Sequence, residues 1–281
     1  IPYNITITMN KKITLSFTLL ALSLNINAQV INKTLNPTIE YDIKFGKYDV
    51  AKKELYKLIR QQPDNGRNYY HLGEIHLKQD NQDSAAYYFK QGLRAPKESN
   101  VNNIGLGKLL LLDKKDKEAK SKFNSGVQDL ALKDFQTYRD IAHAYMYAPN
   151  ADYEMAYQFV GSALLVNKDT PEPHIARGDI YFAEKQFVDA RRVYYSVQKM
   201  FPESLLPKMK LADVLRAGNE FEEAVKVYDT IVSKDPSYVG VYKQMALTYA
   251  DYARFKDDTG LLQKGVDNYF KYHGLIGESL E

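Results

Sequence analysis

Cysteine and tryptophan are both absent from this chain of 281 residues. Without cysteine the chain cannot form disulfides, thiol nucleophiles, zinc–thiolate sites or a lipid-modified N-terminal cysteine. A large charge of one sign is also missing, because 38 Lys and Arg are set against 35 Asp and Glu, for a formal net charge of +3. The basic residues are spread along the chain instead of forming a stripe, which argues against nucleic acid as a partner.

Catalytic motifs are lacking as well. No Gly-x-Ser-x-Gly occurs, and "GLGKLLLL" at Gly105–Leu112 has neither the spacing of a phosphate-binding loop nor a preceding strand. His71 and His76 lie about 140° apart around a helix, so they do not share a face as a zinc-binding pair would. We therefore expect no enzyme activity, no catalytic residue, no cofactor and no metal site, and we interpret His76 as a packed core residue.

Long apolar runs are scarce, and the one at Ile13–Leu24 stands near the beginning. Lys11 and Lys12 precede it and Ala28 follows it, which is the pattern of a secretory signal peptide over residues 9–28. A spanning helix needs roughly 20 apolar residues, so this run is too short, and no later segment could span a membrane. A buried N-terminal helix is the alternative. We expect residues 1–8 to be upstream or leader residues.

Residues of fixed type recur along the rest of the chain. An alanine followed four positions later by a large apolar residue recurs at spacings of 34, 34, 37, 34 and 34 residues, namely at Ala51, Ala85, Ala119, Ala156, Ala190 and Ala224. A second small residue recurs in step, at Gly73, Gly107, Ala142, Gly178, Ala212 and Ala246. Prolines close several of the units, at Pro63, Pro96, Pro202 and Pro236. Such a period predicts an array of similar helical units.

Gly178 and Ala190 show why small residues recur. Glycine costs about 1 kcal/mol relative to alanine inside a helix, so its repeated use needs a compensating gain. Two antiparallel helices approach closely only where the facing side chains are small. We therefore predict that Gly178 and Ala190 lie at a helix crossing, with Tyr181, Tyr194 and Val197 around it. Eight tyrosines occupy core positions of the period: Tyr69, Tyr138, Tyr145, Tyr181, Tyr194, Tyr228, Tyr242 and Tyr249.

The pattern resembles the tetratricopeptide repeat, whose small residue, following aromatic, alanine and closing proline all have counterparts here. The resemblance implies an all-α fold, a right-handed α-solenoid of about seven helix-turn-helix units. We expect one solenoid over residues 29–281, with units near 32–65, 66–99, 100–134, 135–170, 171–204, 205–238 and 239–281. It is also similar to longer exported repeat proteins of Bacteroidetes, which implies the periplasm or the outer membrane of a Gram-negative bacterium.

Three units depart from the pattern. The first has a weak leading helix over residues 35–45, and the fourth carries two extra residues in "MYAPNADYE". In the last unit Gly265 takes the place of the alanine, and we expect seven extra residues in "DYARFKDDTG" to separate its two helices. Phe270, Leu275, Ile276 and Leu280 leave apolar side chains at the end of the chain. They fold back on the preceding helix, or the array continues, or a partner covers this end.

Solenoids of this family usually bind partners on the concave face of their first helices. The register places mixed charges and aromatics there, which suits a protein or peptide segment. The candidate partner-binding residues are Arg67, Tyr70, Glu74, Lys108, Arg139, His143, Tyr147, Asp179, Phe182, Lys210 and Asp213. Ile104, Ile175 and Met209 fall on the same face. The family's carboxylate clamp for chaperone C-termini is not reproduced, and an ordinary solvated face is the alternative interpretation.

The leading hypothesis is a non-catalytic exported scaffold that holds a protein or peptide in this groove. A second hypothesis is a spacer or assembly subunit that works through the ends of the array, by self-association or by continuation of the array. A third is a glycan-binding module that uses the tyrosine-rich face. The superhelical fold does not distinguish them, because such grooves share a fold and differ in their surfaces.

Overall fold

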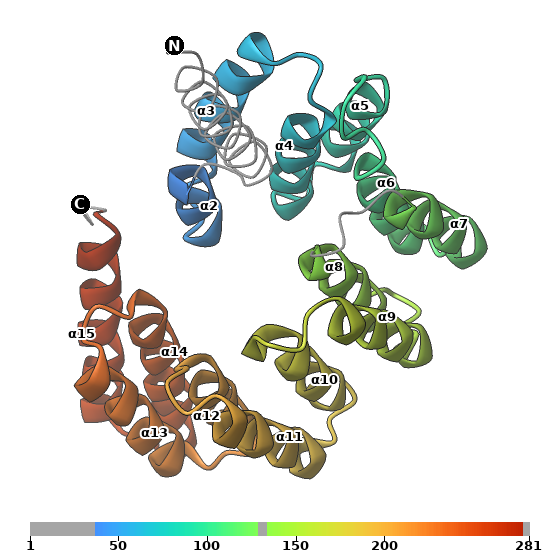
Figure 1. The fold of residues 1–281 in the computed structure, drawn as a ribbon. Coiled ribbons are helices and arrows are strands. Elements are labelled where there is room, and N and C mark those ends of the chain that lie inside the picture. Colours follow the sequence, from blue (N-terminus) through green and yellow to red (C-terminus); the bar gives the residue numbers. More distant parts are fainter. Residues whose placement is uncertain (1–36, 129–133, 278–281) are drawn as a thin grey trace, which may run out of the picture. The chain divides into compact units, whose positions relative to one another are not determined.

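A computed structural model describes residues 37–128 and 134–277 of the chain, and the expected leader at 1–28 lies outside this part. The described residues form fourteen α-helices that follow one another in antiparallel pairs (Figure 1). The all-α architecture of about seven helix-turn-helix pairs is thereby confirmed. The chain divides between Gln62 and Pro63 into two compact units, each described by itself below, and a single solenoid over residues 29–281 stays a prediction.

The first unit contains α2 (Pro37–Lys44) and α3 (Tyr48–Gln61). The two helices contact each other, and Ile39 on α2 and Ala51 and Leu55 on α3 are buried. The turn between the helices passes through Gly46, whose φ of +80° is a left-handed conformation that favours glycine. The helix expected at 35–45 therefore exists, and it is short.

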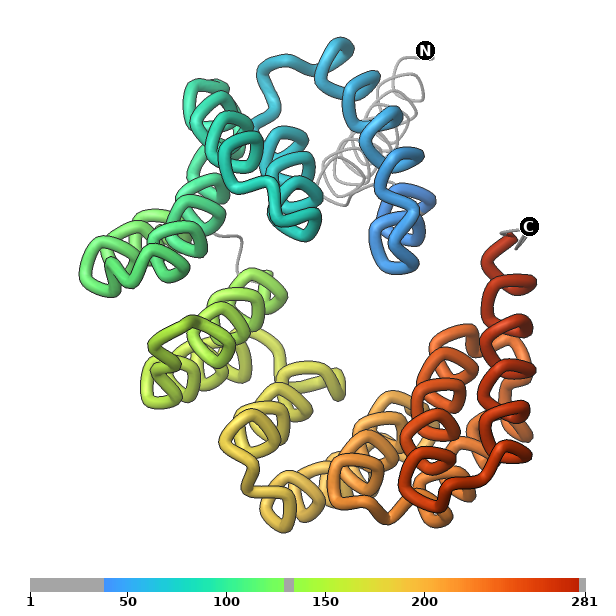
Figure 2. The backbone as a smooth tube through the Cα atoms, turned by 180° about the vertical axis from the view of Figure 1, so that it is seen from behind, coloured from blue at the N-terminus to red at the C-terminus, as the bar shows by residue number. Residues whose placement is uncertain are grey.

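The second unit contains six pairs. They are α4 (Gly66–Lys78) with α5 (Gln82–Leu93), α6 (Asn102–Leu112) with α7 (Asp116–Val127), α8 (Phe135–Met146) with α9 (Tyr153–Val166), α10 (Pro171–Ala183) with α11 (Phe187–Met200), α12 (Leu206–Ala217) with α13 (Phe221–Lys234), and α14 (Val239–Lys256) with α15 (Thr259–Ile276). The first helix of each pair contacts the first helix of the next. Each second helix contacts its own first helix and the one that follows, as the tube of Figure 2 lets the reader trace.

The predicted helix crossings are present. A Cβ atom added to Gly178 would overlap the ring of Tyr194, and Ala190 is completely buried. The same relation holds between Gly73 and Phe89, and between Gly107 and Phe123. A Cβ atom added to Gly105, from the next first helix, would also overlap the ring of Phe89. Small residues therefore give room to one large ring in each crossing, within a pair and between pairs.

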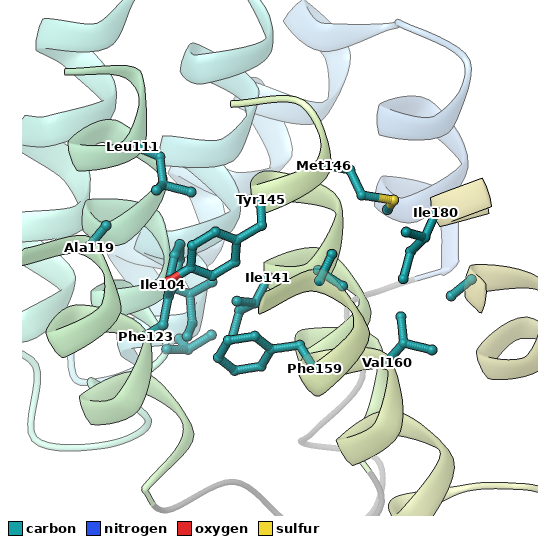
Figure 3. Packing of buried hydrophobic residues seen from close by; sticks show 14 of the residues in the cluster. Ile104, Leu111, Ala119, Phe123, Ile141, Tyr145, Met146, Phe159, Val160 and Ile180 are labelled. Carbon is teal, nitrogen blue, oxygen red and sulfur yellow. The ribbon is translucent and has the colours of Figure 1, made fainter. Parts of the chain in front are cut away.

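The largest core cluster runs across α4–α10 without a break. Its centre is aromatic: Figure 3 shows the rings of Phe123, Tyr145 and Phe159 close together, with Ile141 beside them. The Tyr145 and Phe159 rings stack with their centroids 5.9 Å apart, and Phe123 lies 5.3 Å from Tyr145. Each pair therefore buries its apolar side chains against its neighbours, as a repeat unit that cannot form a core by itself must do.

The prediction that eight tyrosines lie in the core is confirmed in part. Tyr145, Tyr194, Tyr228 and Tyr242 are buried. The remaining four, Tyr69, Tyr138, Tyr181 and Tyr249, are only half-buried. Buried tyrosines use their hydroxyl groups at the edge of the core: Tyr194 Oη donates to Asp179 Oδ1 at 2.7 Å, and Tyr228 Oη donates to Asp213 Oδ1 at 3.1 Å.

The last pair differs from its expected form. The residues of "DYARFKDDTG" do not separate the two helices, because α14 continues through Lys256 and α15 begins at Thr259. This segment contains neither proline nor glycine before Gly260, so α14 continues through most of it and ends where Asp257 takes a left-handed conformation. The insertion therefore lengthens α14 to 18 residues instead of lengthening the turn. Gly265 stands where other units have alanine, and its added Cβ would lie 3.2 Å from the Ala246 carbonyl oxygen.

At the end of the described chain, Ile276 is buried, whereas Phe270 and Leu275 are exposed. Leu280 lies outside the described residues. Tyr269 is 47% exposed, although its counterparts Phe89, Phe123, Val160, Tyr194 and Tyr228 in earlier pairs are no more than 2% exposed. Those counterparts are covered by the first helix of a following pair. The outer face of α15 therefore keeps the apolar character of a stacking surface.

Candidate functional site

The first helices of the second unit, α4, α6, α8, α10, α12 and α14, carry the candidate binding residues. We call the side chains that these helices direct away from the second helices the first-helix surface. Its central column consists of the residue that directly follows each small crossing residue: Glu74, Lys108, His143, Asp179, Asp213 and Leu247. Most of the charges in this column bond to neighbouring elements, and these bonds decide which side chains are left for a partner.

Ion pairs join α4 to its neighbours. Lys108 Nζ donates to Glu74 Oε2 at 2.7 Å and to Tyr70 Oη at 3.5 Å. The Lys108 and Glu74 side chains are only 14% and 18% exposed. Arg67 binds Glu98 and also Asp134, whose Oδ2 lies 3.4 Å from Nη2. These contacts hold α4, α6 and the beginning of α8 together, so the charges concerned are engaged within the chain.

The pKa values around Lys108 reflect this pairing. Burial by itself would lower the pKa of the Lys108 ammonium, but Glu74, Tyr70 and Asp140 together outweigh burial and the pKa is raised. Burial, together with the nearby positive charges of Arg67 and Lys108, lowers the pKa of His71 to about 3. His71 is therefore neutral at pH 7 and adds no charge to this surface.

A second set of contacts joins α10, α12 and α14. Lys210 Nζ lies 2.9 Å from Asp179 Oδ1, which also accepts the Tyr194 hydrogen bond. Burial raises the pKa of Asp213, although Lys210 and the hydrogen bond from Tyr228 oppose that shift. Burial would lower the pKa of Lys210, but Asp179, Asp213 and Tyr147 together outweigh burial and the pKa is raised. Four of the predicted binding residues thus form ion pairs between helices of this chain: Glu74, Lys108, Asp179 and Lys210.

Between these two sets lies α8, whose exposed side chains are not engaged in this way. Tyr147 is 55% exposed at the end of the helix, and its ring centroid lies 4.5 Å from that of His143. In the part of the chain that the structure describes, Arg139 and Asp140 form no ion pair. We call Arg139, Asp140, His143 and Tyr147 the α8 patch. Burial lowers the pKa of His143 despite Asp140 and Asp179, so its ring is neutral at pH 7.

Several residues assigned to the binding face lie elsewhere. Tyr70 was expected to project away from the core, but it is only 6% exposed, and its ring centroid lies 5.9 Å from that of Phe89. Ile104, Ile175 and Met209 occupy the same position in later units and are buried too. This position packs against the neighbouring helix pair in four of the six pairs, and in that column Arg139 and Lys243 are the charged exceptions. Phe182 is half-buried, with its centroid 5.6 Å from that of Phe187.

The histidines show no arrangement for metal binding. Among the described residues, no group of three or more His, Asp or Glu side chains could hold a metal ion. His76 stacks on Tyr88, with the ring centroids 5.1 Å apart, which agrees with its interpretation as a packed residue. Within the same residues, no helix is both long enough and apolar enough to cross a bilayer.

Comparison with protein families finds two matches in this chain. One family model, described as tetratricopeptide repeat, matches residues 41–100. Another with the same description matches residues 181–246. The first range runs from within α2 to beyond the end of α5, and the second runs from the end of α10 into α14. Comparison with curated proteins found no match.

Solved structures resemble the chain in fold. A tetratricopeptide repeat protein from Parabacteroides merdae is 12% identical with a TM-score of 0.53, and the match covers 85% of this chain and 90% of that one. The human IFIT1 dimer with m7Gppp-AAAA is 16% identical with a TM-score of 0.53, covering 83% and 55%. The Cut9–Hcn1 tetramer of APC/C is 14% identical with a TM-score of 0.47, covering 94% and 50%. The chain thus spans about half the length of the last two.

Proposed function

We propose that this chain is an exported, non-catalytic scaffold that binds a peptide segment through its α8 patch. Two segments of the chain match models of the tetratricopeptide repeat, and proteins built of such repeats are typically non-catalytic scaffolds that bind other proteins. The proposal includes the absence of catalysis, of a cofactor and of a bound metal. The proposal restricts the binding surface from the whole first-helix surface to the α8 patch. The ion-paired charges on the neighbouring helices then have a structural role.

The observation that carries the proposal is the exposure of Tyr147 beside His143, with Arg139 on the same helix. Binding surfaces are enriched in tyrosine and arginine, because both supply a large contact area together with hydrogen-bond donors. The other charged candidates on this surface already bond within the chain. A peptide could therefore pair with Arg139 and pack on Tyr147 without breaking any contact that holds the helices together.

Selection from a displayed random peptide library tests this proposal. The full chain is the target, and the peptides recovered are measured by titration calorimetry against Tyr147→Ala and Arg139→Ala variants. We expect each variant to weaken binding by about tenfold or more, because such anchors contribute about 1–2 kcal/mol or more at an interface.

Tyr195→Ala is the matched control, since Tyr195 is 52% exposed but lies on a second helix, α11. It should leave the affinity unchanged. Recovery of no peptide, or of peptides that bind the Tyr147→Ala variant as well as the unaltered chain, would show that the α8 patch is not the binding site.

Export is the second part of the proposal, and its support is the sequence pattern of residues 9–28 alone. In a Gram-negative host we expect the chain in the periplasmic or outer-membrane fraction, with a mature N-terminus at Gln29 by mass spectrometry. A variant with Leu19→Arg and Leu20→Arg breaks the apolar run and should remain uncleaved in the cytoplasm. An unaltered chain that stays uncleaved in the cytoplasm rules out export.

A further inference from the structure

The lengthened helix α14 lines a recess beside the preceding helix pair. The first helix of the preceding pair, α12, ends at Ala217, and the residue 34 positions later is Asp251. Helix α14 continues past this point to Lys256. The additional residues, 252–256, therefore extend beyond the ordinary end of a first helix and stand beside the beginning of α13.

Contacts with α13 hold this extension in place. Phe221 is only 4% exposed, and its ring stacks on Tyr252 with the centroids 5.4 Å apart. The Phe255 ring lies 5.6 Å from Phe221, and the Tyr252 hydroxyl donates a hydrogen bond to Glu222. The additional turn is thus packed on the neighbouring pair and has a defined position.

Between the extension and the α12–α13 turn lies a recess of about 440 Å³. Such a volume falls within the roughly 300–1,000 Å³ that is usual for ligand sites. The recess is lined by Arg216, Ala217, Asn219, Phe221, Asp251, Arg254 and Phe255. One wall is therefore aromatic, and the other carries two guanidinium groups and one carboxylate.

The charged wall has unused capacity for an anion. Asp251 accepts from both arginines: Arg216 Nη1 lies 2.9 Å from Oδ2, and Arg254 Nη1 lies 3.3 Å from Oδ1. Two guanidinium groups share one carboxylate, so the lining keeps a net positive charge. The buried Arg216 Nε has no hydrogen-bond partner, and the Arg254 side chain is 80% exposed. A guanidinium group with free donors binds a carboxylate in a paired geometry.

The aromatic wall is also open. Phe255 is 61% exposed, although its ring centroid lies 5.6 Å from that of the buried Phe221. An exposed phenylalanine next to free arginine donors offers an apolar contact and a charge contact within one recess. We propose that this recess binds an acidic segment of a partner protein, in which an aspartate or glutamate lies next to a large apolar side chain. The carboxylate pairs with Arg254 and Arg216, and the apolar side chain packs on Phe255.

The recess is a site separate from the α8 patch, and it does not depend on the function proposed for that patch. The probe is a short peptide, capped at both ends, in which one glutamate precedes one leucine between glycines. Its counterpart has glutamine in place of glutamate. Capping removes the terminal carboxylate, so binding reports the acidic side chain. Titration calorimetry of the full chain with both peptides measures the affinity.

We expect saturable binding of the glutamate peptide and at least tenfold weaker binding of the glutamine peptide. Arg254→Gln and Phe255→Ser should each weaken the glutamate peptide about tenfold, whereas Tyr147→Ala should leave it unchanged. Arg192→Gln is the matched control, because Arg192 is 76% exposed and also bonds an aspartate three residues away, Asp189. It should have no effect. Absence of saturable binding, equal binding of both peptides, or equal binding by the Arg254 and Phe255 variants would overturn the proposal.

Discussion

Replacement of Phe89 by alanine should lower the free energy of unfolding by about 3–5 kcal/mol, as is usual for truncation of a large buried ring. The Phe89 side chain is completely buried. Gly73 from its own pair and Gly105 from the next pair leave room for it, and the Tyr70 ring lies 5.9 Å away. Loss of the Phe89 ring therefore removes packing within its own helix pair and packing against the next helix pair. Denaturant unfolding followed by circular dichroism measures the change.

Two further variants make this prediction specific. Tyr87→Ala, on the same helix, removes a side chain that is 56% exposed and should change the free energy of unfolding by less than about 1 kcal/mol. Gly105→Ala should destabilise the unaltered chain, because its Cβ would overlap the Phe89 ring. In the Phe89→Ala background the same change should be neutral or favourable. Additive effects of the two substitutions would contradict this crossing geometry.

Reversal of charge at Lys108 should have the second largest effect, a loss of about 3 kcal/mol. Removal of one partner from a buried ion pair costs about 3–5 kcal/mol, and the remaining exposure of this pair places it at the lower end. Lys108→Glu would set a carboxylate against Glu74, with Asp140 also near. It would also remove the hydrogen bond to Tyr70. The free energy of unfolding, again from denaturant titration, is the quantity to compare.

The pair can be tested by exchange. The double variant Glu74→Lys with Lys108→Glu restores opposite charges and should recover at least half of the loss. Lys226→Glu is the surface control, because the Lys226 and Glu223 side chains are 68% and 58% exposed. Exposed pairs contribute about 0–1 kcal/mol, so this change should be small. Equal losses of unfolding free energy in the Lys108 and Lys226 variants would mean that the Lys108–Glu74 ion pair stabilises the chain no more than a surface contact does.

The repeat register was readable from the sequence because it depends on spacing. Small residues at Gly73, Gly107 and Gly178 mark the crossings, and the structure places a large ring against each. A helix pair buries its apolar stripe whatever its neighbour is, so periodicity is sufficient to predict the all-α pairing. The same reasoning identified Tyr147 as a side chain outside the core, and it is 55% exposed.

Burial along the first helices could not be read in this way. Tyr70 and Ile175 lie one turn before the crossing residue, where the next pair covers them, whereas Arg139 in the same column stays partly exposed. Spacing along one helix does not tell how far the neighbouring helix covers it. For the same reason the sequence did not show that Lys108 pairs with Glu74, or Lys210 with Asp179.

The sequence by itself determined the repeat and its crossing residues, because these follow from local spacing and residue type. Only the tertiary structure decided which charged side chains form ion pairs between neighbouring helix pairs. It also decided that the extra residues of the last pair lengthen a helix. A pattern with no helix-breaking residue is compatible with a longer turn or a longer helix, and packing of Tyr252 and Phe255 on Phe221 selects the helix. The recess exists because contacts between successive helix pairs stabilise that additional turn. No local sequence pattern records such contacts.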